Sequence, residues 1–260
     1  MRRFARTLRR SVLLVAVGAV ALLQAGCETV GYYGQAIRGQ TGLLLAREPV
    51  DDLLADPATD AALRQRLGVA RDLLDFADGE LGLEVGGRYG SYVALDRDAV
   101  VYNVFASPPF ALTPVRWCFP IAGCVSYRGY FSEAAAQAKA DELAEAGLDV
   151  HVGGASAYST LGWFDDPLLS TFIERDDAAL ADLLFHELAH GVLYVPGETA
   201  FNESFATFVG REGTRRWLSA RGEDAALEQW RARNARRARF VAAVLELRAG
   251  LAEDYRALRA

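Results

Sequence analysis

The sequence is poor in histidine and cysteine, with three residues of each among 260. It contains no internal repeat and no low-complexity linker, which argues against a repeat architecture. Acidic side chains outnumber basic ones, and the formal net charge of −6 falls to −11 without the five arginines of residues 1–26. A chain this acidic is poorly suited to bind nucleic acid or an anionic lipid surface.

Residues 1–26 have the pattern of a secretory signal peptide, with five arginines, an apolar run over residues 11–26 and small residues before Cys27. The run is shorter than the roughly 18–20 residues that a membrane-spanning helix needs. Gln24-Ala25-Gly26-Cys27 resembles a bacterial lipobox, although Gln24 stands where an aliphatic residue is preferred. We expect Cys27 to be lipidated and residues 27–260 to form one domain. An ordinary cleaved signal or an uncleaved anchor is the alternative.

Glu28 follows the expected lipidation site. In the bacterial sorting pattern, an aspartate directly after the lipidated cysteine favours retention in the inner membrane. Residue 28 is a glutamate and does not match this retention signal. The sequence therefore predicts export to the cell envelope, with a lipid anchor in the outer membrane facing the periplasm of a Gram-negative host.

Cys118 and Cys124 remain after Cys27, and an exported chain meets an oxidising compartment. Pro120 and Gly123 lie between them and can fold the loop so that the two Cα atoms approach within ~7 Å. A small disulfide is the first expectation, and two buried thiols are the alternative. A metal role is disfavoured because no histidine or further cysteine lies near.

Hydrophobic periodicity predicts an α+β chain that is mostly helical and carries a small antiparallel sheet. Two alternating runs in residues 91–106 flank Asp96-Arg97-Asp98 and indicate a β-hairpin. A short strand is expected at residues 148–154. Helices are expected at residues 28–50, 58–80, 131–148 with Ser132 as N-cap, 176–195, 198–219 and, as one helix or two, 223–260.

His186-Glu187-Leu188-Ala189-His190 has the H-E-x-x-H pattern. Residues four apart return to nearly the same face of a helix, so both imidazoles can reach one ion at ~2.0–2.1 Å. Zinc lowers the pKa of bound water to about 7. Glu187 is then placed to take a proton from that water and to deliver it to a leaving amine.

A catalytic zinc needs a third protein ligand and an open position. Glu203 lies thirteen residues after His190 on the next expected helix, and Asn202-Glu203 with Ala206 resembles the N-E-x-x-A pattern of the gluzincin peptidases. Glu198 is a rival ligand, but it falls in the turn. The longer pattern H-E-x-x-H-x-x-G-x-x-H is absent.

H-E-x-x-H alone is a weak signal, because any helix can carry it by chance. Histidine is rare here, and the apolar flanks predict a buried helix, in which imidazoles and carboxylates need partners. Together with Glu203, these features favour a metal site. His151, alone in a strand, is expected to be a structural or surface residue.

The chain resembles a family of bacterial lipoprotein aminopeptidases, zinc metallopeptidases of the gluzincin type with a zincin-like fold. The segments that match span most of residues 27–260: GYYGQAIRGQ, YNVFASPPF, WCFPIAGCVSYRGYF, AYSTLGWFDDPLLS, LLFHELAH and FNESFATFVGREG. The resemblance implies that His186, His190 and Glu203 bind zinc and that Glu187 is the base. It also implies hydrolysis of a peptide substrate from its N-terminus.

The sequence offers alternatives for three further roles, namely pairing with the substrate backbone, stabilising an oxyanion and binding the substrate amine. Residues 157–164 are either a strand that pairs with an extended substrate or a core strand. Tyr158, Tyr194 and Arg128 are candidates for stabilising an oxyanion, and an amine-binding acid could be Glu198, Asp165 or Asp166. The competing functions are a periplasmic endopeptidase, a cell-wall peptidase, and a non-catalytic lipoprotein with a structural metal.

Overall fold

The computed structural model describes residues 29–119, 123–158, 164–195 and 197–259. The chain separates into two compact units, Met1–Leu45 and Ala46–Ala260. The first unit contains a helix over residues 29–45. The predicted signal peptide and Cys27 lie outside the described residues, so this boundary stays a prediction. Within the described part, no helix is both long and apolar enough to cross a bilayer.

The second unit is a mixture of helices and small sheets, which confirms the α+β class. Its strands are β1 (Glu48–Pro49), β2 (Ser91–Val93), β3 (Val101–Ser107), β4 (Trp117–Phe119), β5 (Gly123–Val125), β6 (Arg128–Tyr130), β7 (Asp149–Ala155) and β8 (Leu168–Leu169). Its helices are α2 (Val50–Ala55), α3 (Ala61–Leu81), α4 (Glu133–Glu145), α5 (Ser170–Ile173), α6 (Asp177–Val192), α7 (Thr199–Ala220) and α8 (Asp224–Arg259).

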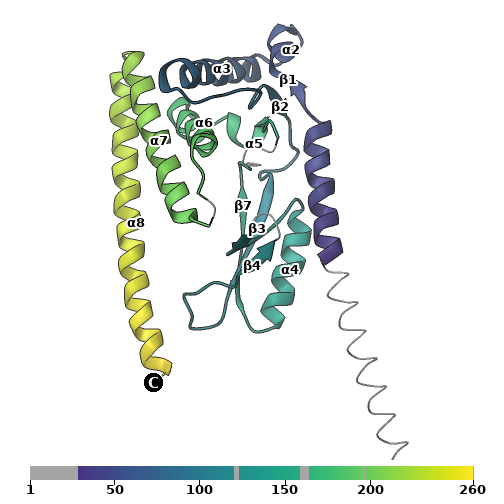
Figure 1. Ribbon diagram of the computed structural model, residues 1–260, viewed down its shortest axis with the longest axis vertical. Helices are drawn as coiled ribbons and strands as arrows, with labels where there is room; N and C mark the ends of the chain where they lie inside the picture. Colours follow the sequence, from purple (N-terminus) through teal and green to yellow (C-terminus); the bar gives the residue numbers. More distant parts are fainter. Residues whose placement is uncertain (1–28, 120–122, 159–163, 196, 260) are drawn as a thin grey trace, which may run out of the picture. The chain divides into compact units, whose positions relative to one another are not determined.

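Three helices, α3, α6 and α7, pack together at one end of this unit (Figure 1). Helix α6 begins at the Asp176 cap, whose carboxylate accepts the Ala179 N–H at 3.0 Å. One face of α6 is apolar and fully buried, including Leu184, Phe185 and Leu188. Burial of each such side chain stabilises the fold by about 1.5–3 kcal/mol. The buried apolar face therefore fixes α6 against the core.

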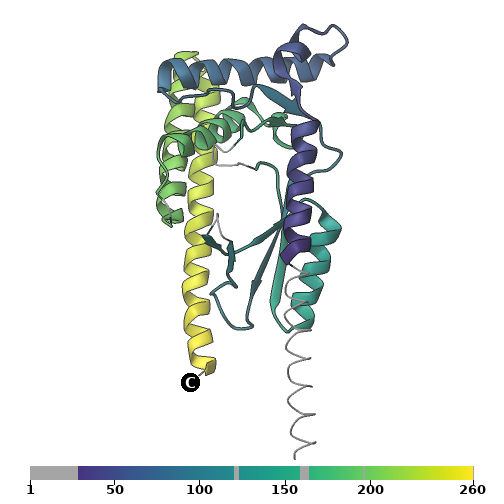
Figure 2. The ribbon, with the colours of Figure 1, turned by 45° about the vertical axis from the view of Figure 1, so that its right-hand side comes forward.

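Helix α7 returns along α6, and α8 lies beside α7 in both Figure 1 and Figure 2. The predicted C-terminal tail is one helix of 36 residues, rather than two. Leu227 and Trp230 in its first turns are buried, whereas most of its later residues are exposed. Its stable anchoring in the unit therefore depends on the N-terminal turns.

The predicted hairpin over residues 91–106 is wrong. Strand β2 pairs with β1 and, in parallel, with β8, whereas β3 lies between β6 and β7 in a separate antiparallel sheet. The segment between β2 and β3 is held instead by the Leu95 N–H, which donates to Ser170 Oγ at 2.8 Å. The seven-residue register of β3 with β7 offers more hydrogen bonds than a local hairpin without a tight turn.

Helix α4 covers the β6-β3-β7 sheet, and Ser132 caps it as predicted. Strands β4 and β5 form a small separate pair in which Cys118 and Cys124 are directly opposite and joined by a disulfide. Of the strand considered for residues 157–164, positions 159–163 lie outside the described residues. Residues 157, 158 and 164 have no strand structure.

The close approach of α7 to α6 generates the first prediction. A Cβ atom at Gly210 would lie 2.7 Å from the Asp182 carbonyl oxygen and 3.2 Å from His186 Cβ. Gly210→Ala should lower the free energy of unfolding by about 1–3 kcal/mol, because backbone must shift. At Gly68 on α3 nothing lies within 4 Å, so Gly68→Ala should raise it by about 0.5–1 kcal/mol. Urea unfolding monitored by circular dichroism measures both, and equal effects would contradict the argument.

Candidate metal centre

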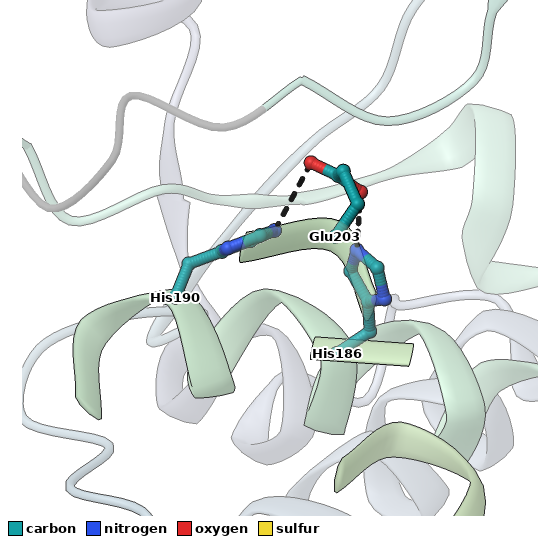
Figure 3. Close-up of side chains that lie close together, drawn as sticks. All are labelled: His186, His190 and Glu203. Carbon is teal, nitrogen blue, oxygen red and sulfur yellow. Dashed lines mark ion pairs between the residues drawn. The ribbon is translucent and has the colours of Figure 1, made fainter. Parts of the chain in front are cut away.

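Three ligand groups converge where α6 faces α7 (Figure 3). His186 and His190 project from successive turns of α6, and their ring centroids are 5.0 Å apart. Glu203 comes from the second turn of α7, with Oε2 at 3.4 Å from His186 Nε2 and Oε1 at 3.6 Å from His190 Nε2. One ligand atom from each residue lies within 4.8 Å of the others. These are the three residues that the sequence predicts as ligands.

The spacing of these atoms fits one tetrahedral ion. Two ligands at ~2.0–2.1 Å from a zinc ion lie about 3.3–3.4 Å apart at the tetrahedral angle. The distances of 3.4 and 3.6 Å from the histidines to Glu203 are close to this value. They are longer than the roughly 2.7–2.9 Å of a charge-assisted hydrogen bond. The spacing is therefore compatible with one metal ion held by the three side chains, with a different carboxylate oxygen of Glu203 near each histidine.

The surroundings of the two histidines also suit a metal site. Burial lowers the pKa of His186, the neighbouring His190 lowers it further, and Glu203 acts in the opposite direction. The His190 side chain is only 7% exposed, and its Nδ1 is buried with no hydrogen-bond partner among the described residues. Burial thus favours the neutral form of the His186 imidazole, which is the form that binds metals.

The turn between α6 and α7 sets the place of Glu203. Gly197 has a φ of +85°, a conformation that residues with a Cβ rarely adopt. The Asn202 side chain is 1% exposed; its Oδ1 accepts the Val195 N–H and its Nδ2 donates to the Val195 carbonyl, both at 2.9 Å. Since Asn202 precedes Glu203, this pair of bonds fixes the start of α7 against the end of α6.

Glu187 lies half-buried on α6, and Tyr89 is its notable neighbour. Burial raises the pKa of the Tyr89 hydroxyl well above its usual value, and the charges of Glu187 and Asp166 raise it further. Tyr89 has a φ of +62°, and its N–H donates to the Asp166 carbonyl at 2.7 Å. A strained residue of this kind is common at functional sites. Sequence reasoning missed it, although the glycines at 86, 87 and 90 mark an unusual backbone.

Tyr127 is a second residue that sequence reasoning missed. Burial raises the pKa of its hydroxyl, and the charge of Glu203 and the nearby Tyr194 raise it further. The pKa of Tyr158 is raised by burial first and then by Asp166 and Tyr127. Two of the three oxyanion candidates, Tyr158 and Tyr194, therefore lie near Tyr127, which in turn lies near Glu203. No pattern in the sequence distinguishes Tyr127, which enters the site through tertiary packing.

The remaining candidate residues differ in their burial and in their neighbours. Arg128 is buried in β6 with its guanidinium carbon 5.9 Å from the Tyr130 ring centroid. Asp166 is buried and close to Tyr89 and Tyr158, whereas Glu198 lies exposed at the N-terminus of α7. Asp166 is the better placed of these two acids. His151 packs beside Phe105 on β7, apart from the three ligands.

The two hydrogen bonds between the Asn202 side chain and the Val195 backbone generate the second prediction. Asn202→Ala leaves the part-buried Val195 N–H without its partner, while the Val195 carbonyl still accepts the Glu198 N–H, and should cost about 1–3 kcal/mol of stability. It should also weaken metal binding, because Glu203 loses its fixed start on α7. Ser204→Ala, one residue beyond Glu203 and exposed, is the control. Metal titration and thermal unfolding of both variants measure this; equal metal affinity in the two would contradict the positioning role.

Comparison with known proteins identifies a family for the chain. The family model described as "Putative aminopeptidase" matches residues 31–260. No curated protein and no solved structure matches the chain. The match covers nearly the whole chain, including α6, α7 and all three sheets. The chain therefore belongs to the family described as "Putative aminopeptidase".

Proposed function

We propose that the protein is a zinc-dependent peptidase that removes residues from the N-terminus of peptides. The observation that carries this proposal is the convergence of two imidazole nitrogens and one carboxylate within 4.8 Å on α6 and α7. Two histidines and a glutamate suit zinc, and this ligand set is common in metallopeptidases. The family description supports the peptidase activity. We further propose that the helices around the site form a zincin-like arrangement.

The number of ligands favours catalysis over a structural role. A structural zinc is usually held by four protein ligands, whereas a catalytic zinc has three and keeps one position open. Among the described residues, the group of ligand atoms contains only His186, His190 and Glu203. Glu198 and Asp165, which could have closed the site, are not members of it. This supports an enzyme rather than a lipoprotein with a structural metal.

Glu187 is the residue that moves protons. When bound, zinc polarises the substrate carbonyl and makes water a better nucleophile. Glu187, next to His186 on α6, takes a proton from the attacking water and delivers it to the leaving amine. The Tyr127 hydroxyl near Glu203, and those of Tyr158 and Tyr194 near Tyr127, are the candidate donors that could stabilise the negative charge on the carbonyl oxygen.

An aminopeptidase must also hold the free amine of its substrate. Asp166 is suited to this role because it is buried beside Tyr89, which in turn lies near Glu187. An endopeptidase needs no such group. The two activities therefore differ in their dependence on a free N-terminus.

We also propose that the protein is exported and anchored by lipid at Cys27 in the outer membrane, facing the periplasm. The arginine-rich start, the short apolar run and the lipobox-like residues before Cys27 support this. Full processing of a bacterial lipoprotein adds more than one acyl chain, as stable anchoring requires.

Glu187→Gln should abolish hydrolysis without loss of the metal. We expect about one zinc per chain in the wild type and in this variant, and none in His186→Ala or Glu203→Ala. Loss of a general base typically lowers the rate by about 10²–10⁴-fold. Metal content by atomic emission and peptide hydrolysis are measured on the same samples. Wild-type turnover in Glu187→Gln would refute its role, and zinc retained in both ligand variants would refute the site.

Blocking the substrate separates the two peptidase activities. An aminopeptidase should cleave free peptides and lose at least about 100-fold in rate on N-acetylated copies, because the amine–carboxylate contact is absent. Asp166→Asn should reduce this discrimination, whereas Asp165→Asn, at the adjacent exposed position, should preserve it. Equal cleavage of free and acetylated peptides would show an endopeptidase instead.

Cys27→Ser should release the protein from the membrane. Fractionation of the envelope and labelling with a radioactive fatty acid are the measurements. The wild type should carry label and sediment with outer membranes, whereas the variant should carry none. Unlabelled wild-type protein would disprove the lipid anchor and leave an ordinary signal peptide or an uncleaved anchor.

A further inference from the structure

A groove begins at the metal centre and follows α7. Its lining includes Glu203, Ser204, Phe208 and Arg211 from α7, and Trp230 from α8. Its volume, about 510 Å³, lies within the range of ligand pockets, roughly 300–1,000 Å³. Because Glu203 belongs both to the groove and to the ligand set, one end of the groove opens at the centre. A substrate bound at the metal can therefore extend along α7.

The groove carries a guanidinium that no described residue neutralises by contact. Arg211 makes no hydrogen bond or ion pair with any residue in the described part of the chain. The acid that follows it, Glu212, is occupied: Arg215 and Arg216 donate to its carboxylate at 2.7–2.9 Å. These hydrogen bonds lower the pKa of Glu212 to about 2. Glu212 thus remains a paired anion and leaves Arg211 available for a ligand.

Positive charge is also in surplus around this part of α7. The nearest competitor for Arg211 is Asp182 on α6, whose pKa is raised by burial. Four arginines act against that shift, namely Arg211, Arg237, Arg233 and Arg175. Arg233 is paired with Asp176, but the other three arginines have no carboxylate partner within ion-pair distance among the described residues, in a protein that is acidic as a whole. An anionic ligand would be attracted to this face rather than to the rest of the surface.

The distance along α7 from Glu203 to Arg211 matches the length of a short extended peptide. Arg211 follows Glu203 by eight residues, which corresponds to about 12 Å along a helix. An extended peptide covers at most ~3.3–3.6 Å per residue, so three to four residues span this length. Phe208, which is 67% exposed, and Trp230 provide apolar surface between the ends.

We propose that Arg211 binds the carboxylate of a short peptide that lies in the α7–α8 groove with its scissile bond at the metal centre. The inference rests on the proposed peptidase function. A planar guanidinium suits a carboxylate because it can donate two parallel hydrogen bonds. The carboxylate is either the C-terminus of a tri- or tetrapeptide or an acidic side chain at the same distance. Short or acidic peptides are the preferred substrate class.

The test measures binding as well as turnover. The full mature chain carrying Glu187→Gln and loaded with zinc is titrated with tetra-alanine, its C-terminal amide, and an amide with glutamate as its last residue. Calorimetry is repeated with Arg211→Gln added. Arg231→Gln, which removes an exposed arginine of α8 outside the groove, is the matched control. Hydrolysis of the three peptides is measured in parallel with Glu187 intact.

We expect tetra-alanine to bind at least about ten-fold more tightly than its amide, as a charge-assisted contact predicts. Arg211→Gln should bring the two within two-fold, whereas Arg231→Gln should preserve the difference. Tight binding of the glutamate amide would identify side chains as a second source of the carboxylate. Equal binding of acid and amide, no binding, or a preference that survives Arg211→Gln would overturn the inference. A preference that depends on Arg211 without hydrolysis of any peptide would leave it standing and refute the peptidase.

Discussion

The close packing of α6 against α7 is the constraint on which the metal centre depends. Small residues on α7 allow this approach: a Cβ at Gly210 would meet the backbone of α6, and one at Gly213 would lie 2.7 Å from the Phe185 ring. The two helices contribute different ligands, so their separation decides whether Glu203 can reach the histidines. An outward shift of even 1–2 Å would leave the three groups unable to share an ion at ~2.0–2.1 Å. Close packing of the two helices and metal binding therefore both require residues without a Cβ at positions 210 and 213.

The surroundings of Glu187 depend on a second close contact. The loop that contains Gly87 and Tyr89 lies against Asp165 and Asp166, and a Cβ at Gly87 would collide with the Asp165 carboxylate. The positive φ of Tyr89 costs on the order of 1–3 kcal/mol, which the buried contacts around it must offset. The result is an ordered hydroxyl near the proposed base. The disulfide between Cys118 and Cys124 has a related effect, because it constrains the β4–β5 pair just before Tyr127.

Charge is distributed unevenly over an acidic chain. The ligand set itself is anionic through Glu203, while arginines gather along α7, α8 and the start of α6. Some of them have structural roles, since Arg233 binds the Asp176 cap of α6 and Arg215 binds Glu212. Others, such as Arg211, make no such contact among the described residues. The arginine-rich part of α8, which the sequence predicts as a solvated helix face, therefore also contributes to the field around the centre.

Local periodicity in the sequence determined the helices and placed His186, Glu187 and His190 on one of them, because the repeat of a helix depends only on neighbouring residues. The spacing to the next helix was enough to indicate Glu203. The partners of the strands were decided by tertiary structure, and the hairpin over residues 91–106 was wrong because pairing energy comes from distant segments such as β7. The same holds for Tyr89 and Tyr127, which come from distant parts of the chain and reach the metal centre only through long-range packing. Arg211 shares its helix with Glu203, but the groove that it lines with Trp230 exists only because α8 packs against α7.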